Sequence, residues 1–433
     1  MKYDKIKSEL FTLNRKNFTK KLKKNSIAVF HSNDIMPTNA DGSMKFKQNS
    51  NLFYLSGIDQ EESILIIYYN LLNKTFEEIM FVKETNDLIA IWEGEKLSKK
   101  EVEKMSGIKQ VKWSQKFEKI FNEIVVNNKI NSIYINTNEH SRNTNKVETQ
   151  NKRFINFITK NYTELSQIKS ADIINELRTI KSNIEVQLVK KACEITRKGF
   201  LQILKFIKPG VKEYEIEAEL ISCFLKNKAT GFAYEPIIAS GKNSCVLHYV
   251  ANNKKCLNND IILMDVGAEY ANYCADMTRC IPVNGIFSDR QKQVYNAVLN
   301  VMKKSINLLR PNVELKFYRE EVNKIMEAEL IKIGLIDKHD VKKQDPKNPA
   351  YKKYFMHGVS HYLGLDVHDV GNINQKIKEG MIFTCEPGIY IPEENLGIRL
   401  ENDILITEKG HTDLMSNIPV EIDEIESYMN YVL

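Results

Sequence analysis

The 433-residue sequence lacks several features that mark whole classes of protein. It has no run of about 18 apolar residues, the length that an α-helix needs to cross a bilayer, so we expect no membrane partner. Its first 18 residues are charged and have no apolar centre, which argues against a secretory signal peptide. No repeat or low-complexity tract is visible. These absences favour a globular protein that works away from membranes.

Paired cysteines and a strong excess of one charge are also missing. The seven cysteines form no CxxC motif and are odd in number, which argues against a disulfide framework. Lys and Arg exceed Asp and Glu by six (62 against 56), and basic residues cluster only in KKLKK at 20–24. A nucleic-acid partner therefore has little support. We predict a reduced, cytoplasmic protein.

The length and the patterning indicate two domains. A chain of this length exceeds one ordinary core. Strand-like runs alternate with helical patterns up to about residue 165, as in SIAVFHS (26–32), FYLSGI (53–58) and SILIIYY (63–69). Helical patterns then dominate. We predict an α/β (α+β) protein with an amino-terminal domain over 1–170 and a second domain over 171–433.

Four helices are predicted early in the second domain and in its middle. Ser182 with Glu185, and Ser288 with Gln291, form capping-box patterns that begin two of them. Apolar periodicity places the others over about 213–228 and 316–333. The polar, proline-bearing segment 337–355 is predicted to be a loop.

Four acidic residues lie in two hairpin patterns of the second domain. Asp265 and Asp276 are symmetric about a turn predicted near Tyr270 and Ala271, which would make them cross-strand partners with Cβ atoms roughly 5 Å apart. Glu386 and Glu401 are symmetric about 393–394 in the same way.

Acids in strands usually face solvent, but both hairpins have apolar flanks, as in ILMDVGA and IFTCEP. A buried acid without a partner is costly, so the two pairs indicate a shared ligand.

Histidines add to these carboxylates. His357, His361 and His368 fall within twelve residues, in a stretch whose glycines favour a loop over a helix. A lone histidine is more often structural, whereas three beside two acidic hairpins favour a site. His248, in SCVLHYV, is a weaker candidate on spacing alone. Four carboxylates and an imidazole are typical ligands of two neighbouring divalent ions, which activate water for hydrolysis.

Four motifs resemble one family. The D-x10-D pair, HG-x-SH-x-LGLDVHD, EPG-x-Y and R-x-E are similar to those of the pita-bread metallopeptidases, in the aminopeptidase P (Xaa-Pro aminopeptidase) group. KFKQNSNLFYLSGIDQEESILI (45–66) and IWEGEKL (91–97) resemble that group's creatinase-type leading domain. Lys47 and Asn51 depart from the arginine and aspartate common there. The resemblance implies a creatinase-type amino-terminal domain followed by a pita-bread catalytic domain.

The resemblance also implies roles for the candidate ligands. Asp265 would chelate one ion, Asp276 and Glu401 would bridge both, and His361 and Glu386 would complete the second. Manganese is the family's usual ion, and zinc, cobalt and iron stay open. Glu386 would also shuttle a proton to the leaving nitrogen.

Further residues would act around these ions. By resemblance, His248, His357 and His368 would steady the substrate and the oxyanion, and Arg399 with Tyr390 would hold a ligand carboxylate. Trp92 would reach a neighbouring subunit's active site in a homodimer or homotetramer. The alternative is that Trp92 anchors its own domain.

The implied reaction removes the first residue from peptides with proline second, with hydroxide held by two metal ions as the nucleophile. Prolidase, which splits Xaa-Pro dipeptides, is the alternative. The leading domain and the SHYLGLDVHD motif favour the aminopeptidase. Methionine aminopeptidase typically lacks a large leading domain. A peptide-binding module without activity is disfavoured by the intact ligand set.

Overall fold

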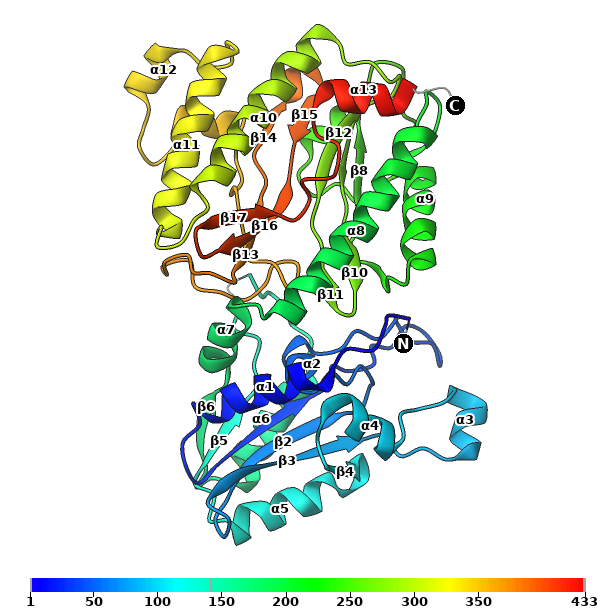
Figure 1. Ribbon diagram of the computed structural model, residues 1–433, viewed down its shortest axis with the longest axis vertical. Helices are drawn as coiled ribbons and strands as arrows, with labels where there is room; N and C mark the ends of the chain where they lie inside the picture. Colours follow the sequence, from blue (N-terminus) through cyan, green and yellow to red (C-terminus); the bar gives the residue numbers. More distant parts are fainter. Residues whose placement is uncertain (1, 141, 431–433) are drawn as a thin grey trace. The chain divides into compact units, whose positions relative to one another are not determined.

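The structure, a computed structural model, describes residues 2–140 and 142–430, and the chain divides into two compact units (Figure 1). The leading unit ends at Arg178 and the second begins at Thr179. Helix α7 (Ala171–Thr179) begins directly after the predicted domain limit at residue 170, and that limit stays a prediction.

The leading unit is built on one mixed sheet. Its helices are α1 (Ser8–Thr19), α2 (Ser50–Ser56), α3 (Asp87–Glu93), α4 (Lys99–Ser106), α5 (Phe117–Asn127), α6 (Gln150–Asn161) and α7 (Ala171–Thr179). Its strands are β1 (Ser26–His31), β2 (Ile64–Asn70), β3 (Thr75–Val82), β4 (Gln110–Trp113), β5 (Ser132–Ile135) and β6 (Ser166–Lys169). Among the described residues they form a six-stranded sheet in the order β4-β3-β2-β1-β5-β6. Phe117 and Phe121 of α5 and Phe154 of α6 pack with strand residues in its apolar core.

The segment FYLSGI is helical, so its assignment as a strand was wrong. Asn49 caps α2 because its side chain accepts hydrogen bonds from the backbone of Asn51 and Leu52, and Gly57 ends the helix at φ +68°. Residues 52–56 are all buried. A short apolar run that is buried on every side has no period to separate helix from strand.

The second unit contains two helix pairs and several small sheets. Its helices are α8 (Asn183–Phe206), α9 (Glu213–Lys226), α10 (Asp289–Leu308), α11 (Leu315–Lys332), α12 (Lys338–Lys343) and α13 (Ile422–Asn430), with 3-10 turns η2 (Gly241–Cys245), η3 (Ala350–Lys353) and η4 (Pro392–Glu394). Its strands are β7 (Gly231–Phe232), β8 (Ile237–Ser240), β9 (Ile261–Asp265), β10 (Ala268–Tyr270), β11 (Tyr273–Cys274), β12 (Thr278–Pro282), β13 (Ile382–Cys385), β14 (Gly388–Ile391), β15 (Leu396–Arg399), β16 (Asn402–Thr407) and β17 (Gly410–Asp413). Helix α8 packs on α9, and α10 packs on α11 (Figure 1).

The four predicted helices of this unit are confirmed as α8 to α11, and both capping boxes form at their predicted serines. The predicted loop over 337–355 is wrong in part, because it contains α12 and η3. Helix α12 reads KHDVKK and has no apolar face, so the sequence carries no helical period there.

All seven cysteines are free thiols. Within the described residues, no helix combines the length and the apolar character needed to cross a membrane.

Candidate metal centre

The first acidic hairpin has a different register from the predicted one. Strand β9 pairs with β12 so that Asp265 lies opposite Thr278, not opposite Asp276. The turn is one residue later than predicted because Ala271 and Asn272 both adopt left-handed conformations (φ +54° and +65°). Asp276, two residues before Thr278, is therefore a diagonal neighbour of Asp265 on the same face.

The second hairpin has the predicted register. In one continuous alignment, β13 pairs with β16 and β14 with β15. Cys385 lies opposite Asn402 and Gly388 opposite Arg399. Glu386 and Glu401 fall at symmetric positions in the gap between these two ladders. The break frees both residues from regular pairing while keeping them across from each other.

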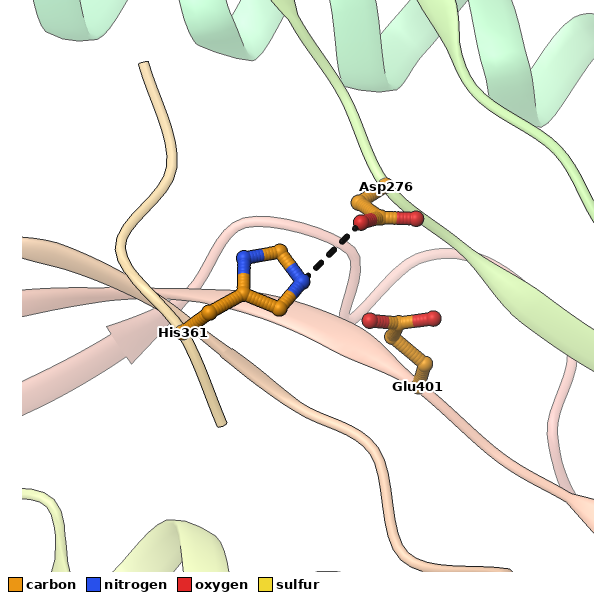
Figure 2. A group of neighbouring side chains, drawn as sticks. All are labelled: Asp276, His361 and Glu401. Atoms are coloured by element: carbon orange, nitrogen blue, oxygen red, sulfur yellow. Dashed lines mark ion pairs between the residues drawn. The ribbon is translucent and has the colours of Figure 1, made fainter. Parts of the chain in front are cut away.

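Three of the predicted ligands converge on one point (Figure 2). One side-chain donor atom from each of Asp276, His361 and Glu401 lies within 4.8 Å of the other two. The His361 Nε2 atom is 3.3 Å from Asp276 Oδ2 and 3.7 Å from Glu386 Oε1. These three residues lie up to 125 positions apart in the sequence, and the fold brings them together in a group suited to a cation.

A hydrogen bond to the backbone fixes the orientation of the His361 ring. Its Nδ1 atom lies 3.0 Å from the backbone carbonyl of Tyr362, and a carbonyl oxygen can only accept, so Nδ1 carries the hydrogen. Nε2 therefore faces the carboxylates. This is the arrangement by which proteins fix a metal-binding imidazole.

The carboxylates of this centre have little access to solvent, since Asp276 and Glu401 are buried and Glu386 is half-buried. Burial raises the pKa of all three, and repulsion from neighbouring carboxylates, Asp265 among them, adds to each shift. The pKa of Glu386 reaches about 7. Like charges in a poorly solvated site are costly, and a divalent cation removes that cost. The donor set of carboxylate oxygens and imidazole nitrogen fits hard or borderline divalent ions.

Asp265 lies beside the cluster and is held by two residues. Arg399 donates to Asp265 Oδ2 at 2.7 Å. The Tyr234 hydroxyl is 2.6 Å from Asp265 Oδ1 and 2.6 Å from Asp276 Oδ1, so it links the two aspartates. Burial, followed by the nearby carboxylates, raises the pKa of Tyr234 well above its ordinary value. Tyr234 was not foreseen, because GFAYEP carries no motif.

Glu401 is also supported by residues that the sequence did not single out. Thr278 donates its hydroxyl to Glu401 Oε2 at 2.7 Å. Arg279 is fully buried and donates to the backbone carbonyl of Glu401 at 2.7 Å and of Thr278 at 3.0 Å. These contacts tie the two hairpins to each other.

A second chain of hydrogen bonds leads from Arg399 to His357. Arg399 donates to the Tyr390 hydroxyl at 2.9 Å, and that hydroxyl is 2.8 Å from His357 Nε2. Burial, and then the charge of Arg399, lower the pKa of His357 to about 4. His357 is therefore neutral at physiological pH, and Tyr390 contacts Arg399 and His357.

The remaining candidates lie around or apart from this cluster. His368 is exposed and its ring is edge-on to that of His361, with 4.5 Å between centroids. His248 is exposed after η2, and it contributes to the lowered pKa of His357. Trp92 belongs to the leading unit, where it is 83% exposed on α3. It is therefore not packed in the core of its own domain.

Known families match both units. Residues 187–408 match metallopeptidase family M24, and residues 11–134 match the aminopeptidase P N-terminal domain. The chain belongs to metallopeptidase family M24. The match to the aminopeptidase P N-terminal domain confirms the resemblance to aminopeptidase P that the motifs indicated.

Relatives match along almost the whole chain. The Xaa-Pro aminopeptidase of Haemophilus influenzae is 30% identical over 99% of this chain and 98% of its own length, and that of Escherichia coli is 30% identical over 98% of each. The structure of E. coli aminopeptidase P with the inhibitor Pro-Leu superposes with a TM-score of 0.88 at 28% identity, covering 98% of this chain and 99% of that one. A Bacillus anthracis structure assigned as a candidate aminopeptidase P gives 0.91 at 34% identity, covering 98% of both chains. The predicted fold, a pita-bread domain after an aminopeptidase P leading domain, is confirmed.

Proposed function

We propose that this chain is a metal-dependent Xaa-Pro aminopeptidase, which hydrolyses the first peptide bond of peptides with proline second. The observation that carries the proposal is the convergence of Asp276, His361 and Glu401 on one point. Full-length relatives named Xaa-Pro aminopeptidases support the substrate class, and they disfavour the prolidase alternative.

The metal centre would use the five predicted ligands. Asp265 would hold one ion, Asp276 and Glu401 would bridge two, and His361 and Glu386 would hold the second. Mn²⁺ is our choice because the donors are mostly oxygen. When bound, two such ions lower the pKa of water and polarise a carbonyl.

The chain's own residues would move the proton and hold the substrate. Glu386 would take a proton from the nucleophile and pass it to the leaving nitrogen. Arg399 fixes Asp265 and, through Tyr390, the neutral His357. His248, His357 and His368 would then bind the peptide and the developing oxyanion.

We further propose a homodimer or homotetramer with a cytoplasmic location. Helix α3 exposes Leu88, Ile91 and Trp92 by 65%, 77% and 83%, which is the kind of apolar surface that a second subunit covers. Trp92 would line one side of the peptide site in the neighbouring subunit. None of the seven cysteines is paired in a disulfide, which fits a reducing compartment.

A comparison of three peptides tests the proposed substrate class. Purified protein with Mn²⁺ is incubated with a Xaa-Pro-Xaa tripeptide, the matched Xaa-Ala-Xaa tripeptide and the Xaa-Pro dipeptide, and free amino acid is measured. We expect release from the proline tripeptide and little from the other two. Cleavage of the dipeptide alone would identify a prolidase, and preference for the alanine tripeptide would refute proline specificity.

A further inference from the structure

The loop that carries His248 has little regular structure of its own. After η2, residues 246–254 form only turns and irregular backbone. Val246 and Val250, on either side of His248, are 52% and 49% exposed, so apolar burial does not fix this part of the loop. Polar contacts hold it instead. Buried Asn252 bonds to Glu217 and to the backbone of Pro236 and Ile238, and Tyr249 and Lys254 make further contacts.

One buried carboxylate supplies the contacts at Tyr249 and Lys254, and it also binds the segment just before the loop. Glu213, in the first turn of α9, is 0% exposed. Its Oε1 atom accepts hydrogen bonds from the backbone N–H (2.8 Å) and hydroxyl (2.7 Å) of Ser240 and from the Asn243 amide (3.4 Å). Its Oε2 atom accepts from the Tyr249 hydroxyl at 2.8 Å and from the backbone N–H of Lys254 at 2.9 Å. Five donors therefore converge on two oxygens.

These five donors define the chemistry that the position requires. Both oxygens act only as acceptors, so an ionised carboxylate satisfies every donor. An amide of the same shape would place an NH₂ group against donors at one of the two oxygens. A buried donor that loses its acceptor is left unsatisfied, which is costly.

The turn η2, which precedes the loop, is also held by the metal-site hairpin. Ser244 of η2 accepts a hydrogen bond from the backbone N–H of Gly397 at 2.8 Å, in strand β15, which ends at Arg399. Glu213 thus joins the end of β8 to the neighbour of His248 and to the last residue of the loop, while β15 holds the turn from which the loop starts.

We propose that Glu213 is a positioning residue that sets the place of His248 at the peptide site, acting through Ser240, Tyr249 and Lys254. The inference rests on the proposed role of His248 in binding the substrate. Glu213 does not itself touch the reacting atoms, so its effect must pass through the loop.

A double-mutant cycle tests this assignment. Glu213→Gln should lower kcat/KM by about 10–100-fold, the usual effect of losing a supporting contact, with metal content unchanged. In a His248→Ala background the same substitution should cost less than about twofold, because the group that it positions is gone. In a His368→Ala background its cost should remain full. Glu215→Gln, at an exposed site of the same helical turn, serves as the matched control. Glu215 accepts a hydrogen bond from the backbone N–H of Lys212 at 2.7 Å, and a glutamine oxygen can accept it too, so activity should stay unchanged.

Hydrogen exchange gives a readout that does not depend on activity. Glu213→Gln should speed exchange in peptides covering 240–254 and leave the β13–β16 peptides unchanged. If the glutamine variant does not fold, Tyr249→Phe removes one donor beside His248 and should show a smaller loss with the same non-additivity. A full, additive loss in the His248→Ala background, or unchanged exchange of 240–254, would overturn the inference. Full activity of His248→Ala would instead refute the proposed role of His248.

Discussion

At the scale of residues, the sequence identified the carboxylates of the metal centre but not the groups that hold them. An acid inside an apolar strand is unusual and costly, so Asp276 and Glu401 stand out. Thr278 gives no such signal, because its contact with Glu401 joins residues 123 positions apart. Glu213 looks like any acid in the first turn of a helix until its five donors are seen.

His368 provides a prediction at this scale. Its ring is exposed and lies edge-on to His361 without being one of the proposed ligands. We expect His368→Ala to lower kcat by about 10²–10³, the usual effect of losing an oxyanion donor. Metal content, measured by elemental analysis, should stay unchanged, and His339→Ala on α12 should match the wild type. Loss of metal in His368→Ala would instead make this residue a ligand.

His31 gives a pH-dependent prediction. It is 2% exposed beside Phe117 and Phe154, and its Nδ1 atom has no hydrogen-bond partner. Burial, and then the charge of Arg153, lower its pKa to about 3. The unfolded chain binds this proton more readily, so stability is complete above about pH 6.5 and falls as the pH drops toward 3.

His31→Phe removes that contribution. Between pH 7 and 4.5, the unfolding free energy of the wild type should therefore fall by about 3 kcal/mol more than that of the variant. Urea unfolding of both proteins at the two pH values measures the difference. Parallel losses in the two proteins would show that His31 does not bind a proton on unfolding.

At the scale of elements, regular patterns were predictable and local departures from them were not. The capping boxes of α8 and α10 and the register of the second hairpin follow from short-range rules. The first hairpin differed because two left-handed residues moved its turn by one position. That shift makes the two aspartates diagonal neighbours across the hairpin. The contact of the Tyr234 hydroxyl with both of them could not be predicted from any local sequence pattern.

The loop that carries His368 yields a prediction about stability. Lys181, between α7 and α8, lies 3.0 Å from Asp369, and both side chains are 1% exposed. A Cβ atom on Gly364 would lie 2.2 Å from the same carboxylate, so the site has no spare room. Lys181→Met removes the ammonium group from the side of a buried carboxylate and should destabilise the second unit by up to about 3–5 kcal/mol.

Replacing both partners separates the ion pair from general packing. Lys181→Met with Asp369→Leu should recover part of the lost stability, since an apolar pair can replace a buried ion pair. Lys109→Met, which breaks an exposed pair with Glu103, should leave urea unfolding unchanged. Wild-type stability in Lys181→Met would show that the pair contributes nothing.

At the scale of the whole molecule, the length and patterning predicted the α/β class, and the motifs predicted the family. The hydrophobic pattern of the sequence does not predict the assembly, because subunit contacts depend on surfaces that need not show any periodicity. Trp92 is exposed in a short helix with Leu88 and Ile91, a cluster that became visible only in the folded unit.

Trp92→Ala tests that surface. If Trp92 lines a neighbouring subunit's peptide site, the variant should have a raised KM for peptides. Its melting temperature should fall little and its metal content should stay unchanged. Light scattering should show at least a dimer for the wild type. A wild-type monomer with full activity would contradict the proposed assembly.

Metal removal and replacement test the central claim most directly. The protein is stripped by chelation, shown by elemental analysis to be metal-free, and titrated with Mn²⁺ while Xaa-Pro-Xaa cleavage is followed. Activity should vanish on stripping and return to a plateau at about two ions per chain. Asp276→Ala and Glu401→Ala, which each remove a proposed bridge, should stay inactive at every Mn²⁺ concentration, whereas Glu408→Ala on the surface should behave as the wild type. Full cleavage by the metal-free protein would contradict the claim.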